Sequence, residues 1–203
     1  MANKHFFQPV RMESQYVDTK LQTVMFQADE ANAACYDGEL AVLGDFVKDP
    51  VYLGAFTAAS AADSAPVDFN TRAATVPAAA TAVGVGVIDL PTVPTAAGAG
   101  VTYRMGYKTI GLTAEAGVPV RFRKLVVDDT FATGEENCTA ALTVGQYAVL
   151  ATGGDAGKWA PAADAAATGC YAKVISKYIV SQGVDGKVTD DGVQAYMLCV
   201  MAN

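Results

Sequence analysis

Histidine is almost missing from this 203-residue sequence, which contains only His5. A catalytic triad and a metal cluster each need several convergent groups, and one histidine near the N-terminus builds neither. Serine or cysteine nucleophiles would lack their usual histidine base, and no motif for a lysine-based variant is present. We therefore expect a protein that is not an enzyme and that has no cofactor or metal site.

Closely spaced cysteines are also missing. The four cysteines, Cys35, Cys138, Cys170 and Cys199, are far apart in the sequence and form no C-x-x-C pair. This spacing argues against a zinc site or a disulfide framework. It predicts reduced thiols that are buried as small hydrophobic side chains.

Basic charge and long apolar runs are scarce. The chain has 14 Lys and Arg against 21 Asp and Glu, for a net charge of -7. This balance argues against a nucleic-acid partner, whose phosphates are neutralised by basic side chains. No window approaches the roughly 20 apolar residues of a membrane helix. The first residues lack the apolar stretch of a secretion signal, so we expect synthesis in the cytoplasm.

Aromatic residues are few, at 9% of a chain that is 52% hydrophobic, because alanine and valine supply most of the apolar content. Small side chains each bury little area, at roughly 25 cal/mol per Å². Such a core gains from neighbouring subunits, which favours an assembly with hidden surface. A compact monomer is the alternative.

The stretch Val101–Leu150 is predicted to form the centre of the fold. Within it, Val120 and Phe122 alternate with Arg121 and Arg123, as in a strand with one buried face. The apolar triplet 125–127 follows, and an acidic pair at 128–129 ends the strand. The run 143–150 is rich in β-forming residues and is predicted to be its partner.

Short strand-like runs separated by glycine and proline turns continue along the chain, and no long helix is credible. They predict an all-β fold, a small barrel or sandwich with irregular loops rich in Ala, Thr and Pro. The last run is apolar on both faces, so we expect it to be central in its sheet or covered by another subunit. The further strands are expected at 39–43, 51–56, 83–90, 171–180 and 194–201, with a long loop at about 57–82.

Residues 1–35 are predicted to form an extended N-terminal arm, followed by a β-domain over 36–203. No helical stripe in this segment lasts more than two turns, and strand alternation is only partial. An arm of this kind would lie against a partner through Phe6, Phe7, Val10 and Phe26. An ordinary first strand with a frayed end is the alternative.

Arg121, Arg123 and Lys124 form the one compact basic cluster of an acidic sequence. Two interpretations are open. The cluster is either a solvated strand face that discourages pairing between sheet edges, or a docking patch for an acidic partner surface.

Three segments together resemble the auxiliary virion proteins of tailed bacteriophages, most of all the head decoration, or cement, proteins. The resemblance covers about the last hundred residues. It implies a β-rich protein that binds capsids as a trimer or an extended clamp and has no catalytic residues. The segments are GLTAEAGVPVRFRKLVVDDTF (111–131), TAALTVGQYAV (139–149) and GCYAKVI (169–175).

From this resemblance we expect a structural protein at the capsid surface of the virion. Its partner would be the major capsid protein, it would stabilise the shell across subunit junctions, and it would itself be a homo-oligomer, with a trimer as the first expectation. Two alternatives are a tail-tube or other tail component, and a host- or glycan-binding module. The second would need exposed aromatic rings, for which Trp159 and Tyr171 are the candidate pair.

Overall fold

The computed structural model describes residues 5–17, 20–29, 31–48, 67–90, 111–166, 168–180, 183–184, 187–188 and 192–203. These residues form β-strands and three short 3-10 turns, and no α-helix occurs among them, so the predicted all-β fold is confirmed. Within the same ranges, no helix has the length and hydropathy to cross a membrane. The strand expected at 51–56 and the first part of the central stretch, 101–110, lie outside the described residues.

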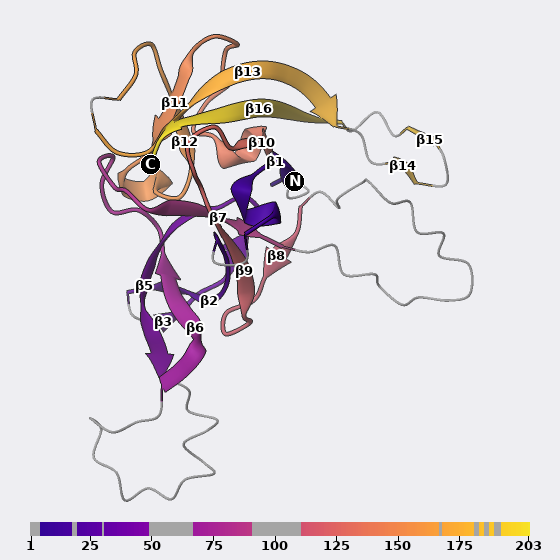
Figure 1. Cartoon of the computed structure of the whole chain (residues 1–203). Helices are drawn as coiled ribbons and strands as arrows, with labels where there is room; N and C mark the ends of the chain where they lie inside the picture. The colour runs from indigo at the N-terminus through magenta and orange to yellow at the C-terminus, as the bar shows by residue number, and fades with distance from the viewer. Residues whose placement is uncertain are drawn as a thin grey trace, which may run out of the picture.

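The first sheet has six antiparallel strands, with the order β1-β10-β16-β13-β11-β12. The last strand of the chain, β16, lies between β10 and β13, so its predicted central position is confirmed. In Figure 1, β13 and β16 form a long curved pair along one side of the molecule. The bounds are β1 Phe7–Arg11, β10 Thr130–Gly134, β11 Tyr147–Leu150, β12 Trp159–Ala162, β13 Tyr171–Val180 and β16 Val193–Ala202.

The second sheet closes on itself as a five-stranded barrel. Its strands follow the order β2-β6-β5-β7-β9, and β9 pairs again with β2. Closure removes the sheet edges. All barrel pairings are antiparallel except β2 with β6. The bounds are β2 Leu21–Ala28, β5 Leu40–Lys48, β6 Val67–Thr75, β7 Val85–Asp89 and β9 Val120–Lys124.

Short elements complete the described chain. Strand β3 (Ala31–Asn32) pairs antiparallel with the end of β2, while β4 (Cys35–Tyr36) pairs with β8 (Thr113–Ala114), and β14 (Gly183–Val184) with β15 (Lys187–Val188). The 3-10 turns are η1 (Glu13–Gln15), η4 (Glu135–Asn137) and η5 (Gly153–Asp155).

The barrel interior is narrow and is filled by Val24, Phe26, Ile88 and Phe122, with small residues between them. Gly86 is required by this packing, because a Cβ there would overlap the Phe122 ring and lie 2.5 Å from the Arg123 carbonyl oxygen. The predicted burial of Val120 and Phe122 is confirmed, since they are 5% and 0% exposed.

Strand β7 belongs to the two larger cores of the molecule. All five of its residues are buried. Ile88 points into the barrel, whereas Val85 and Val87 pack on the opposite side with the core of the first sheet. The sequence of a strand that is buried on both faces is usually a near-continuous apolar run, and the sequence of β7 is of this kind. The barrel and the first sheet are therefore joined by a shared wall.

The core of the first sheet contains a row of aromatic rings. Phe7 contacts Phe131 at a centroid distance of 5.5 Å, and Phe131 contacts Trp159 at 6.2 Å. All three are fully buried. Phe7 thus brings the N-terminal strand β1 into the same core as β10 and β12.

Strand pairing corrects the predicted arm over residues 1–35. The described part of this segment supplies β1 to the edge of the first sheet and β2 to the barrel wall. Partial alternation misled the prediction because β1 is short and carries a bulge after Pro9. The alternative, an ordinary first strand, agrees with the structure.

Two further expectations are corrected. Residues 67–75 of the predicted long loop form strand β6. The small alanine side chains of this strand made the sequence resemble a loop, but they fit the interior of a narrow barrel, where Ala74 is fully buried. The run 143–150 is not the partner of 120–124: β11 pairs with β12 and β13, whereas β9 pairs with β7 and β2.

Candidate functional site

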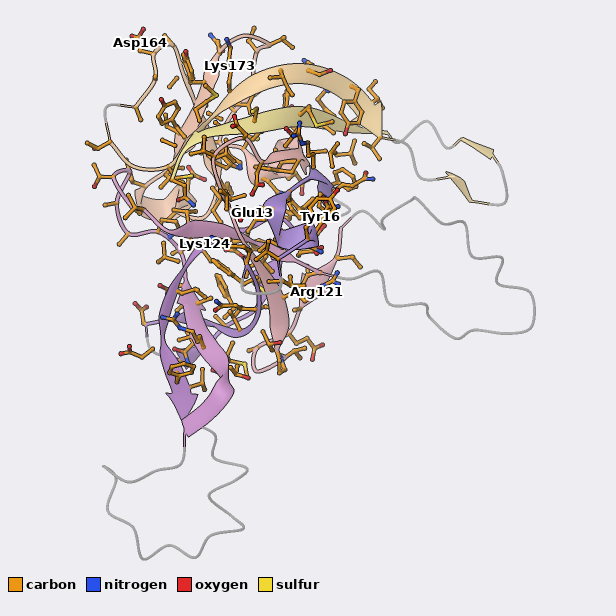
Figure 2. All side chains as sticks on the ribbon, viewed as in Figure 1. Glu13, Tyr16, Arg121, Lys124, Asp164 and Lys173 are labelled. Atoms are coloured by element: carbon orange, nitrogen blue, oxygen red, sulfur yellow. The ribbon has the colours of Figure 1, made fainter. Side chains whose placement is uncertain are left out.

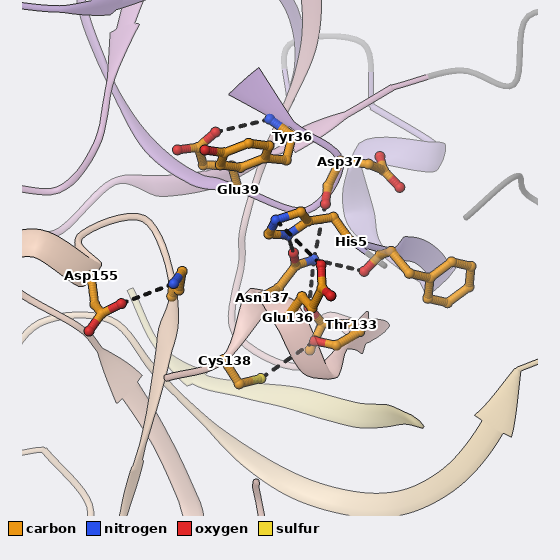
Figure 3. Close-up of polar contacts among 12 residues, drawn as sticks. His5, Tyr36, Asp37, Glu39, Thr133, Glu136, Asn137, Cys138 and Asp155 are labelled. Carbon is orange, nitrogen blue, oxygen red and sulfur yellow. Dashed lines mark hydrogen bonds and ion pairs between the residues drawn. The ribbon is translucent and has the colours of Figure 1, made fainter. Parts of the chain in front are cut away.

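The described residues contain no group of three or more His, Cys, Asp or Glu side chains that could hold a metal ion. Their strongest concentration of polar groups lies where the barrel meets the first sheet (Figure 3). We call it the polar junction, and it consists of His5, Tyr36, Asp37, Glu39, Thr133, Glu136 and Asn137.

Asn137 is the centre of the polar junction. Its amide nitrogen donates to the carbonyl oxygens of Phe6 at 2.8 Å and Asp37 at 3.0 Å, and contacts the Thr133 hydroxyl at 3.3 Å. The residue is 2% exposed. One buried side chain thus ties the N-terminal segment, the Asp37 turn and the end of β10 together, and buried polar atoms need such partners.

Asp37 satisfies two further backbone groups of the same junction. Its carboxylate accepts from the amide nitrogens of Phe7 and Leu90, each at 2.9 Å, and the residue is fully buried. The turn here depends on Gly38, whose φ of 85° is readily adopted only by glycine. Asp37 thus fixes a loop of the barrel against β1.

His5 is built into this junction as well. Its ring stacks on Tyr36 with a centroid distance of 4.3 Å, its Nδ1 contacts the Asn137 side-chain oxygen, and its Nε2 lies 3.9 Å from Glu136. These contacts give the single histidine a structural position between the N-terminal segment and η4.

Glu39 is a half-buried member of the polar junction. Burial raises its pKa to about 7, although the Tyr36 amide that donates to it at 3.0 Å and the nearby Lys158 both oppose the rise. This carboxyl group can therefore exchange a proton near neutral pH.

The cysteines are free, and Cys35, Cys138 and Cys170 are buried. Burial raises the pKa of each of these three thiols to about 12, so they stay protonated and weakly nucleophilic at neutral pH. The prediction of buried, reduced thiols is confirmed for them, while Cys199 is half-buried.

The predicted basic cluster on β9 is partly neutralised by Asp89 of β7. Arg123 Nε donates to the Asp89 carboxylate at 2.6 Å, and Arg121 Nη2 lies 3.1 Å from it. Arg123 is only 8% exposed, which corrects its assignment to the solvated face of the strand. Of the three basic residues, Arg121 and Lys124 remain accessible on the barrel (Figure 2).

Three of the four apolar residues expected to contact a partner are interior residues of this chain. Phe6, Phe7 and Phe26 are 1%, 0% and 5% exposed. Their assignment to an intermolecular interface is corrected, because side chains that fill this chain's own cores offer no surface to another. Val10 is 48% exposed at the edge strand β1.

The aromatic pair considered for glycan binding is not an exposed platform. Trp159 is fully buried in the first core. Tyr171 is half-buried and meets Tyr147 edge-on, with ring centroids 5.8 Å apart. The tryptophan ring therefore has no face available for a sugar.

The outer half of β13 has the accessible apolar residues that sequence reasoning missed. Ile175 is 46% exposed and Ile179 is 70% exposed, and Lys173 and Lys177 are exposed on the same strand. The sequence signal was the alternation of 171–180, in which these residues fall beside lysines. A bulge between Val174 and Ser176 shifts the register and complicates that pattern.

Comparison with known proteins gives no relative: no family model, no curated protein and no solved structure matches the chain.

Proposed function

We propose that the chain is a structural protein of a tailed-bacteriophage virion, a decoration protein that binds the outer capsid surface. The observation that carries the proposal is the contrast between the apolar residues that fill the cores and those that stay exposed on β13. Both cores are filled by the chain's own residues, while Ile175 and Ile179 stay exposed on a long strand at one side of the molecule. Exposed apolar positions grouped on a rigid scaffold are typical of a binding surface.

In this proposal the partner is the major capsid protein, and the decoration protein bridges neighbouring capsid subunits. Contacts at several junctions raise the free energy needed to separate them, since a ligand that binds only the assembled form stabilises it. A homo-oligomer, with a trimer expected first, would bind more tightly through avidity. The resemblance of 111–131, 139–149 and 169–175 to cement proteins supports the same function.

The test is the copy number of this chain per major capsid protein in purified particles, measured by quantitative mass spectrometry. A ratio near one, or a simple fraction such as about a third, is expected for a symmetric shell component. A much smaller ratio would instead favour a tail component. Absence of the chain from particles would refute a virion function.

A further inference from the structure

Half of strand β13 has a pairing partner on one side only. Strand β11 pairs with β13 at Tyr171, Ala172 and Lys173, whereas β16 pairs with it as far as Val180. In the described parts of the chain, no strand pairs with the other side of 175–180. Figure 1 shows this end of β13 extending past β11, with β16 on its inner side. We call residues 175–180 the open edge.

The open edge is protected in a different way from the ends of the same sheet, by Lys177 and by a bulge between Val174 and Ser176. Edge strands β1 and β12 contain Pro9 and Pro161, and proline has no amide hydrogen to offer to another strand. The open edge has no proline and instead exposes Ile175 and Ile179. Such an edge is a template for a further strand.

The charge at the open edge indicates what that strand contains. Lys177 is exposed, and within the described residues it forms no ion pair with a carboxylate. The Lys177 ammonium group lies 5.8 Å from the centre of the Tyr196 ring. Opposite charges on adjacent strands are stabilising and like charges are destabilising, so the fitting strand carries Asp or Glu beside apolar residues.

We propose that the open edge binds an extended, acidic and apolar segment of the major capsid protein by adding it as a strand next to β13. This inference rests on the proposed function for the identity of the partner. Backbone hydrogen bonds would supply affinity, and Lys177 and the two isoleucines would select the segment.

A second copy of this chain fits the open edge less well. A twofold pairing of the edge with itself, centred on its middle, would place the two Lys177 side chains on neighbouring strands, where like charges are destabilising. The lysine therefore favours a different, acidic partner.

The binding test uses shells assembled from the major capsid protein of the same phage, mixed with the full chain and sedimented. Ile179→Asp and Lys177→Glu should each weaken binding by about tenfold, because each places a carboxylate against an acidic strand. The matched control is Val83→Asp, since Val83 is a β-branched residue with a similar exposure of 67% outside the open edge. It should bind as the unmodified chain does.

Amide hydrogen exchange of the bound and free chain tests the backbone pairing itself. Strand addition should slow exchange within 175–180 when shells are present, because outward amides gain acceptors. Unchanged exchange there, or Ile179→Asp and Lys177→Glu binding equally with Val83→Asp, would overturn the open-edge proposal while leaving capsid binding intact. Failure of the unmodified chain to bind shells would instead overturn the proposed function, and with it the capsid segment as partner.

Discussion

The side chain of Asn203 holds both backbone groups of Val85. Its oxygen accepts from the Val85 amide at 2.8 Å, and its nitrogen donates to the Val85 carbonyl at 2.8 Å and to the Leu125 carbonyl at 2.6 Å. One amide group thus acts as a strand partner for β7 at the place where the two cores share that strand.

Replacement of Asn203 by alanine should lower the free energy of unfolding by about 2 kcal/mol, since three hydrogen bonds are lost and strand groups are left unpaired. Guanidinium chloride denaturation measures the change. Thr152→Ala is the control, because this exposed side chain makes no capping hydrogen bond. Equal midpoints for the two variants would contradict the structural role of Asn203.

Gly86→Ala should destabilise the barrel by about 2 kcal/mol or more, because the added methyl group overlaps the Phe122 ring in a filled interior. Thermal unfolding followed by circular dichroism measures the effect. Gly154→Ala provides the comparison, since a Cβ at that position meets nothing within 4 Å. A Gly86→Ala protein as stable as Gly154→Ala would show that the barrel interior has spare room.

Asp89→Ala should lower the free energy of unfolding by about 3 to 5 kcal/mol, because it leaves the Arg123 guanidinium buried without its carboxylate partner. Arg121→Ala should cost less than 1 kcal/mol, as the Arg121 side chain is 40% exposed. Urea denaturation ranks the two variants. Asp155→Ala, which breaks the exposed pair with Lys158, is a control expected to be nearly neutral. The reverse ranking would refute the buried pair as a stabilising link between β7 and β9.

Glu39 should make the protein less stable as the pH rises from about 4.5 to about 7. Burial raises its folded-state pKa to about 7 from the usual 4.5, so the folded chain holds this proton more tightly than the unfolded chain does. The resulting stabilisation is complete below pH 4.5 and is lost as pH rises through the folded pKa. Glu39→Gln should remove this contribution, as measured by denaturation at pH 5 and pH 8. Glu115→Gln, at an exposed position, should leave the profile unchanged.

Strands with either a clear difference between faces or a continuous apolar run could be predicted from the sequence. Strands β13 and β16 were expected at nearly their observed positions, since lysines mark the wet face of one and continuous apolar residues mark the central place of the other. Strand β7 was expected for the same reason. Its Asp89, a carboxylate within an apolar run, was a signal for a buried basic partner that the prediction did not use.

Pairing between distant strands could not be predicted. Alternation places Arg123 and Phe122 on different faces of β9. Whether the face with Arg123 meets solvent or another core depends on which strands flank β9. The same limit applies to Phe6 and Phe7, whose apolar character fits a docking arm as well as an edge strand. The open edge of β13 could not be predicted either, because it depends on where the pairing between β13 and β11 ends.

The pairing of β1 with β10 sets the order in which the protein can fold as it is synthesised. Phe7 is paired with Thr133, and Leu21 with Arg123, so β1 and β2 each have a partner that is synthesised much later. Contacts between such distant residues slow folding and lengthen the exposure of apolar strands. The barrel can close only after β9 has been made, and the core of the first sheet only after β16.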